Sequence, residues 1–227
     1  MKQTVNIFQL RTLISTLSAL AVAYYLPKIV AQVIAYKKAR KPEGSYKVYD
    51  VKSYTKITNY ILLVIVFGSQ SLYYQGLDLI LVATISTLAI VSMRVDQKIR
   101  IIPNEIVFSI LGLAFIRQSY VNNLEGLLSS VIAMVLIAVV FYVSTQITST
   151  YFGQGGVGAG DVKLTIAMAA FFGSQQVLIF MMCIAAVLLT YIAYGFIFKK
   201  YTMKTTFPMG LQITYGFLFA TIVVNLI

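Results

Sequence analysis

Two aspartates, Asp96 and Asp161, are the residues whose surroundings point most clearly to chemistry. Each lies at the edge of an apolar segment, where an ionisable side chain is costly and is a functional candidate by default. Two carboxylates that share one proton can hydrolyse a peptide bond, because one activates water while its protonated partner polarises the scissile carbonyl. The chain has no His and a single Cys. A His-based triad, a zinc site with His ligands and an internal disulfide are therefore excluded.

The segment before Asp161 is exceptionally rich in glycine. Within eight residues it holds Gly153, Gly155, Gly156, Gly158 and Gly160. This density opposes a helix and predicts a loop that another backbone can approach closely. Asp161 then begins an apolar helix, so a flexible turn with a capping aspartate is the simpler alternative. Lys163 could lower the pKa of Asp161 through its charge, or anchor the helix at the membrane surface.

The segment after Asp96 predicts the start of another helix. Pro103 suits a first helical turn, where its missing N–H has no partner to lose, and Asn104 can satisfy exposed N–H groups nearby. The basic residues Arg94, Lys98 and Arg100 could bind lipid phosphates or keep Asp96 ionised. The remaining acids have structural explanations, as members of a lysine-rich loop or as helix-start residues: Glu43, Asp50, Asp78, Glu105 and Glu125.

The elements that must position these aspartates are membrane-spanning helices. Of the 227 residues, 59% are hydrophobic and only 11% are charged, and mean hydropathy is +0.84. A soluble globule of this composition would expose very large apolar patches. We expect an all-α polytopic membrane protein with about eight transmembrane helices. Their predicted ranges are 12–36, 57–76, 78–93, 101–116, 124–148, 162–174, 176–198 and 206–227. The segment 162–174 is short enough to be re-entrant, although parity favours a crossing.

The net charge of +11 is explained by the orientation of the helices in the membrane, because basic residues gather on the cytoplasmic side. If the loop at 37–56 is cytoplasmic, the junctions at 94–100, 149–161 and 199–205 are cytoplasmic too. Together with Lys163 they hold 14 of the 18 Lys and Arg residues, as the positive-inside rule requires. Basic helix ends also suit anionic membrane lipids, so we expect no nucleic-acid partner. Both aspartates then lie at the cytoplasmic boundary.

Three motifs resemble those of type IV prepilin peptidases, which are GxGD-type intramembrane aspartyl proteases. They are DQKIRIIPN at 96–104, GVGAGDVKL at 156–164 and FPMG at 207–210. The resemblance covers residues 78–227 and implies a six-helix GxGD protease core, preceded at 1–77 by two helices joined by the basic loop. It implies that Asp96 and Asp161 are the catalytic pair and that Gly158 and Gly160 shape the active-site loop. Pro208 and Gly210 match the late motif, with a structural or substrate-facing role.

The resemblance also implies a substrate and a place of action. Family members remove the short basic leader from prepilins or pseudopilins at the cytoplasmic face of the cell membrane, beside the hydrophobic segment of the substrate. Longer bacterial members carry a cysteine-rich region associated with zinc and N-methylation, whereas the loop at 37–56 has no Cys. This excludes zinc there and argues against an N-methyltransferase activity. No metal or cofactor is expected, and Cys183 is assigned to helix packing.

Two other functions fit part of the sequence. In a small proton-coupled transporter, Asp96 and Asp161 would relay protons, but internal repeats or broken helices at mid-membrane are then expected and no convincing repeat is present. A catalytically silent membrane assembly factor is the third reading. The sequence does not specify the particular prepilins, the pilus, secretion or DNA-uptake role, or the oligomeric state.

Overall fold

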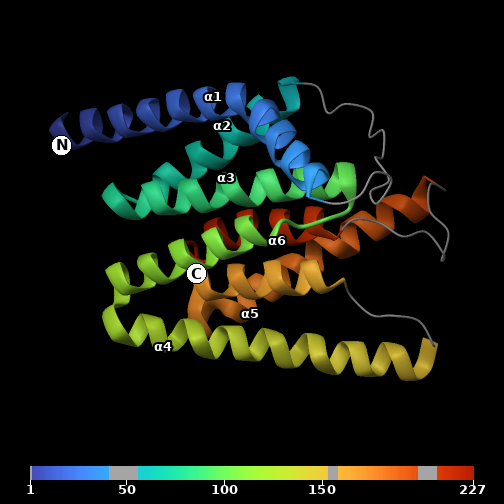
Figure 1. The fold of residues 1–227 in the computed structure, drawn as a ribbon. Coiled ribbons are helices and arrows are strands. Elements are labelled where there is room, and N and C mark those ends of the chain that lie inside the picture. The colour runs from blue at the N-terminus through green and yellow to red at the C-terminus, as the bar shows by residue number, and fades with distance from the viewer. Residues whose placement is uncertain (1, 41–55, 153–157, 199–208) are drawn as a thin grey trace. The chain divides into compact units, whose positions relative to one another are not determined.

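Helices account for all the regular structure in the part of the chain that the structure describes. The computed structural model describes residues 2–40, 56–152, 158–198 and 209–227 (Figure 1). The helices are α1 (Lys2–Ala39), α2 (Lys56–Tyr73), α3 (Gly76–Ile99), α4 (Asn104–Phe152), α5 (Ala159–Ile197) and α6 (Gly210–Val223). Four of them are long and apolar enough to cross a membrane, over Gln9–Ala39, Gly76–Ile99, Asn104–Ile147 and Ala159–Ile197. The predicted all-α membrane class is thus confirmed.

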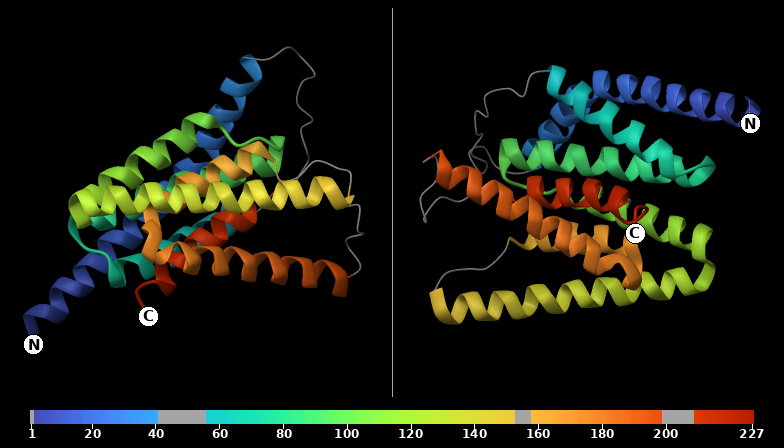
Figure 2. Two further views of the ribbon diagram at one scale, coloured as in Figure 1. Left: turned by 90° about the horizontal axis from the view of Figure 1, so that it is seen from below. Right: turned by 180° about the vertical axis from the view of Figure 1, so that it is seen from behind.

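Two of the long helices reverse direction inside their span. The apolar stretch of α4 has 44 residues, which would be about 66 Å if straight, twice the hydrocarbon thickness of a bilayer. Asn123 (φ 53°, ψ −140°) interrupts α4, and Gly173 (φ 68°, ψ 178°) interrupts α5. Figures 1 and 2 show each helix doubling back there as a hairpin. If each interrupted helix is counted as two, the described residues contain eight helical segments, but only four helices are long and apolar enough to cross a membrane, so the count of about eight transmembrane helices stays a prediction.

The predicted junction at 94–100 is wrong in its extent. α3 continues to Ile99, and Arg100 ends the helix in the left-handed conformation (φ 55°, ψ 39°). The N–H of Arg100 donates to the carbonyl oxygen of Asp96 at 2.8 Å. The third apolar range was predicted to end at residue 93, but Arg94 and Asp96 are buried at 7% and 6% exposure and belong to the helix.

Cα packing divides the chain into two compact units, Met1–Arg100 and Ile101–Ile227. The boundary predicted between residues 77 and 78 is a functional one, because it separates the protease core from the two N-terminal helices. That functional boundary stays a prediction. In the first unit, α1 packs against both α2 and α3. Pro27 lies inside α1, where its ring removes one backbone hydrogen bond and bends a helix. The N-terminal helix bends part-way along its length (Figure 1).

In the second unit, α5 packs against both α4 and α6. Its core is an aromatic cluster formed by Phe171, Phe172, Phe180 and Phe217, with neighbouring ring centroids about 5–6 Å apart. Gly216 allows α6 to approach α5, because a Cβ there would stand 2.6 Å from Cγ1 and 2.8 Å from Cα of Ile184. Small residues at helix crossings permit this proximity in membrane proteins.

The reversal at Gly173 is stabilised by polar side chains from α4. A broken helix leaves backbone groups without helical partners, which is costly in an apolar interior. Gln118 donates its amide to the carbonyl oxygen of Phe171 at 2.6 Å, and Ser130 Oγ donates to that of Ala170 at 2.7 Å. The N–H of Ser174 donates to Ser129 Oγ at 2.8 Å. These bonds fix the two reversals against each other.

Candidate active site

Asp161 lies in the first turn of α5, on the edge of the buried core. Gly158 occupies the N-cap position and its carbonyl accepts a hydrogen bond from the N–H of Val162 at 3.2 Å. Asp161 is therefore the third helical residue and not the N-cap itself, which corrects the capping alternative. The residue is half-buried and is followed by the fully buried Leu164 and Thr165. A carboxylate here is stabilised by the positive end of the helix dipole.

The glycines of the GxGD motif have separate packing roles. A Cβ at Gly158 would stand 2.8 Å from Oδ2 of Asp161, so the carboxylate would have to shift from its position over the helix start if another residue replaced the glycine. A Cβ at Gly160 would stand 3.3 Å from Cβ of Ile102. The GxGD segment thus lies directly against the Ile-Pro-Asn segment. The neighbour at Gly160 is the side chain of Ile102, whereas another backbone was expected there.

The Ile-Pro-Asn segment begins α4 as predicted. Pro103 is buried and immediately precedes the helix, and its carbonyl accepts hydrogen bonds from the N–H groups of Ile106 (3.1 Å) and Val107 (3.2 Å). Asn104 is exposed and is the first helical residue. Proline fits this position because the missing N–H would have no helical acceptor.

Asp96 lies in the last turn of α3, in the first compact unit, beside a buried polar cluster. Arg94 donates to Asn59 Oδ1 at 2.6 Å and to Gln97 Oε1 at 3.1 Å. Asn59 and Gln97 are themselves buried, at 9% and 5% exposure. Arg94 is thus engaged inside the protein, which argues against the expected role in binding lipid phosphates. Because Asp96 and Asp161 belong to different compact units, their pairing stays a prediction.

The other predicted site residues fall into two groups. Lys163 is exposed on the first turn of α5, a position compatible with a membrane-surface anchor. Gly210 is buried and begins α6, and its structural or substrate-facing role in the late motif stays a prediction. Pro208 lies outside the described residues, as do Gly153, Gly155 and Gly156.

Within the described ranges, no group of three or more acidic, Cys or His side chains is arranged to hold a metal ion. Cys183 is a free, half-buried thiol inside α5, as its assignment to packing requires.

Sequence reasoning missed the polar cluster at the helix reversals. Arg117 and Gln118 are buried, at 9% and 3% exposure. The guanidinium carbon of Arg117 lies 4.1 Å from the centre of the Phe171 ring, a cation–π contact. The signal was present as two polar runs, RQSYVNNLEG at 117–126 and GSQQ at 173–176, each interrupting apolar sequence. The predicted apolar ranges 101–116 and 124–148 left residues 117–123 between them, whereas most of these residues are helical.

The apolar hairpins and the glycine-bounded carboxylate at a helix start define a polytopic helical membrane protein with a candidate hydrolytic site. Residues 81–227 match the type IV leader peptidase family. The match covers well over half of the chain and includes both aspartates, so the chain belongs to this family of peptidases. No curated protein and no solved structure matches the chain.

Proposed function

We propose that the chain is an intramembrane aspartic endopeptidase that removes the basic leader from type IV prepilins or pseudopilins. The close approach of Ile102 to Gly160, at 3.3 Å for a Cβ on the glycine, is the observation that best supports this function. It joins the two motif segments that carry the aspartates, since Asp96 precedes Ile102 by six residues and Asp161 directly follows Gly160. Family membership supports the same reaction class.

The proposed mechanism uses Asp96 and Asp161 as a pair that shares one proton. The ionised carboxylate removes a proton from water as the oxygen attacks the scissile carbonyl carbon. The protonated carboxyl donates a hydrogen bond to the carbonyl oxygen, and the leaving amine receives a proton as the C–N bond breaks. Neither a metal nor a covalent enzyme intermediate takes part in this sequence.

We further propose eight membrane crossings, one for each helical segment. In the second unit, the first part of α4 has 19 residues from Asn104 to the reversal, about 28 Å, which matches the hydrocarbon thickness. The first part of α5, from Ala159 to the reversal, has 14 residues, about 21 Å, and its buried surroundings allow a shorter crossing. The beginnings of α4 and α5 then share one face, with both reversals at the other.

The distribution of basic residues supports a cytoplasmic position for the face that carries the aspartates. A substrate helix would reach this face laterally through the lipid, with its basic leader in the cytoplasm. Five of the eight residues at 153–160, directly before Asp161, are glycines, which leave room for an extended cleavage segment. The prepilins themselves are the proposed partners, and N-methylation is not part of the proposal.

The test is co-expression with a candidate prepilin, with leader removal followed by intact-mass measurement. Asp96→Asn and Asp161→Asn are each expected to abolish cleavage while the protein still accumulates in the membrane. Asp78→Asn is the matched control, because Asp78 also lies at a helix end but in the first turn of α3, and it should cleave normally. Normal leader removal by either folded aspartate variant would refute the paired mechanism.

A further inference from the structure

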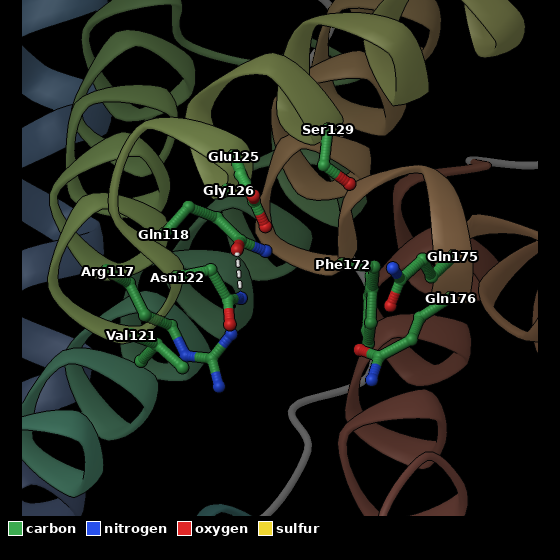
Figure 3. A pocket seen from close by; sticks show the side chains of 10 residues that line it. All are labelled: Arg117, Gln118, Val121, Asn122, Glu125, Gly126, Ser129, Phe172, Gln175 and Gln176. Atoms are coloured by element: carbon green, nitrogen blue, oxygen red, sulfur yellow. Dashed lines mark hydrogen bonds between the residues drawn. The ribbon is translucent and has the colours of Figure 1, made fainter.

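A polar pocket of about 260 Å³ lies at the two helix reversals of the second unit (Figure 3). The first α4 segment, about 28 Å long, separates it from the contact between Ile102 and Gly160. Its lining comes from α4 and α5 on both sides of the reversals: Arg117, Gln118, Val121, Asn122, Glu125, Gly126, Ser129, Phe172, Gln175 and Gln176. None of these residues belongs to the proposed catalytic machinery.

Two polar side chains of the lining are already engaged by the protein. Arg117 NH1 donates to the carbonyl oxygen of Phe171 at 3.3 Å, and the guanidinium contacts the Phe171 ring. Gln118 donates to the same carbonyl oxygen at 2.6 Å and accepts a hydrogen bond from Asn122 at 2.9 Å. Arg117 and Gln118 therefore build the pocket wall, and no ligand contact is assigned to either.

Three other polar side chains supply the binding capacity of the pocket. Glu125 and Gln175 are exposed and Gln176 is half-buried. Within the described ranges, none of these three side chains is committed to another protein group. Figure 3 shows Gln175 and Gln176 across the pocket from Asn122, with both carboxamides directed into it.

These side chains combine hydrogen-bond donors with acceptors. A glutamine carboxamide donates through its NH2 group and accepts through its oxygen, whereas a carboxylate only accepts. An anionic ligand would be repelled by Glu125. An ammonium group only donates and would leave the NH2 groups of Gln175 and Gln176 unmatched. A hydroxyl both donates and accepts, so a neutral ligand with several hydroxyls matches the whole set.

We propose that this pocket binds the sugar headgroup of a glycosyl diacylglycerol, with the sugar hydroxyls bound by Glu125, Gln175 and Gln176. Neighbouring hydroxyls donate to the carboxylate oxygens, and the remaining hydroxyls exchange hydrogen bonds with the two carboxamides. Val121 and Phe172 add apolar lining, which suits the C–H groups of a sugar ring. The volume is slightly below that of typical small-molecule pockets, which suits a single hexose whose acyl chains remain in the bilayer.

The location of the pocket supports a lipid as the source of this sugar. The α4 segment from Asn104 to Asn123 matches a hydrocarbon thickness, so the reversal lies at headgroup depth when the helix spans a bilayer. This placement rests on the crossings proposed above. Exposed apolar side chains adjoin the pocket on α4, with Val121 at 43%, Leu124 at 69% and Leu128 at 58% exposure. They provide a surface for acyl chains next to the polar site.

The test is the thermal stability of the purified full chain in a detergent without a sugar headgroup, with added lipids that share the same acyl chains. At about ten times its Kd, monoglucosyl diacylglycerol should raise Tm by about 3–6 °C. Phosphatidylethanolamine, phosphatidylglycerol and diacylglycerol should each raise it less. Gln175→Ala and Glu125→Ala should each remove this preference, whereas Gln146→Ala, which removes an exposed glutamine of α4 outside the pocket, should keep it. The readout requires no peptidase activity, so the lipid site and the proposed reaction can fail independently.

Four outcomes would overturn the proposal. Equal stabilisation by all four lipids would leave no headgroup preference, and a larger shift with either phospholipid would assign the pocket to a charged headgroup. An unchanged preference in Gln175→Ala or Glu125→Ala would place the lipid elsewhere. A shift produced by water-soluble methyl glucoside but not by the glycolipid would assign the pocket to a free sugar. Both variants should keep the Tm of the lipid-free protein, because Glu125 and Gln175 are exposed.

Discussion

The carboxylate of Asp161 lies against the backbone of Gly158, where a Cβ atom would stand 2.8 Å from Oδ2. A side chain three positions before the aspartate would therefore force the carboxylate to move. This contact also links a sequence motif to a geometric requirement, because Gly158 is the N-cap of α5 and controls the space into which the carboxylate folds.

Gly158→Ala should therefore displace the Asp161 carboxylate without unfolding the helix. We expect prepilin cleavage to fall roughly 10²-fold, since a displacement of about 1 Å at a reacting group has this effect. The rate of leader removal by the purified variant measures it. Gly112→Ala is the control, because a Cβ there meets nothing within 4 Å, and it should retain full activity. Equal rates for the two variants would contradict the assigned role of Gly158.

The approximate bounds of the helices could be predicted from the sequence, because they follow from the lengths of the apolar runs. Eight apolar ranges were expected, and the described helical segments follow them with shifts of a few residues at most boundaries. The buried end of α3 was missed because Arg94 and Asp96 are charged, and charge alone predicts exposure. The buried Arg94 donates a hydrogen bond to Asn59, which lies 35 residues away in sequence.

The part of the candidate site around Asp161 was predictable, because the glycines of the GxGD motif indicate a close approach of neighbouring atoms. The glycines before Asp161 predicted that another segment could approach closely, and the side chain of Ile102 does so at Gly160, although a backbone was expected. The polar network at the reversals was not predictable in the same way. Its members Gln118 and Ser130 act on backbone oxygens of Phe171 and Ala170, which become available only because Gly173 breaks the helix.

Ser130→Ala tests this network. The hydroxyl supplies a hydrogen bond to the carbonyl oxygen of Ala170 across the helix pair, so its loss should leave that oxygen poorly satisfied in the interior. We expect unfolding to become easier by about 1–2 kcal/mol, measured by denaturation in mixed micelles. Ser109→Ala is the matched control, because Ser109 bonds only to Glu105 O within its own helix and is exposed. Similar losses in both variants would refute the cross-helix role.

Gly216→Ala tests the contact between α5 and α6. The added methyl group would meet the side chain and the backbone of Ile184 at less than 3 Å, so the two helices must separate. Overpacking of this kind costs about 1–3 kcal/mol, and Tm of the detergent-solubilised protein should fall. Gly68→Ala has open space around its Cβ and should leave Tm unchanged or slightly raised, as alanine favours a helix. A Gly216 variant that is as stable as the Gly68 variant would contradict this close contact.

Asn59→Ala tests whether α2 supports the end of α3 that carries Asp96. Asn59 accepts a 2.6 Å hydrogen bond from the buried Arg94 guanidinium, and removal of an acceptor from a buried charge costs about 1.5–3 kcal/mol. Arg94 is two residues from Asp96 on the last turns of the same helix, so a loosened Arg94 should also lower leader cleavage. Asn225→Ala is the control, because Asn225 is exposed and its side-chain amide donates to the carbonyl oxygen of Thr221 in its own terminal segment. Reduced stability with an undiminished cleavage rate per folded molecule would assign Asn59 a packing role alone and separate it from the proposed catalytic aspartate.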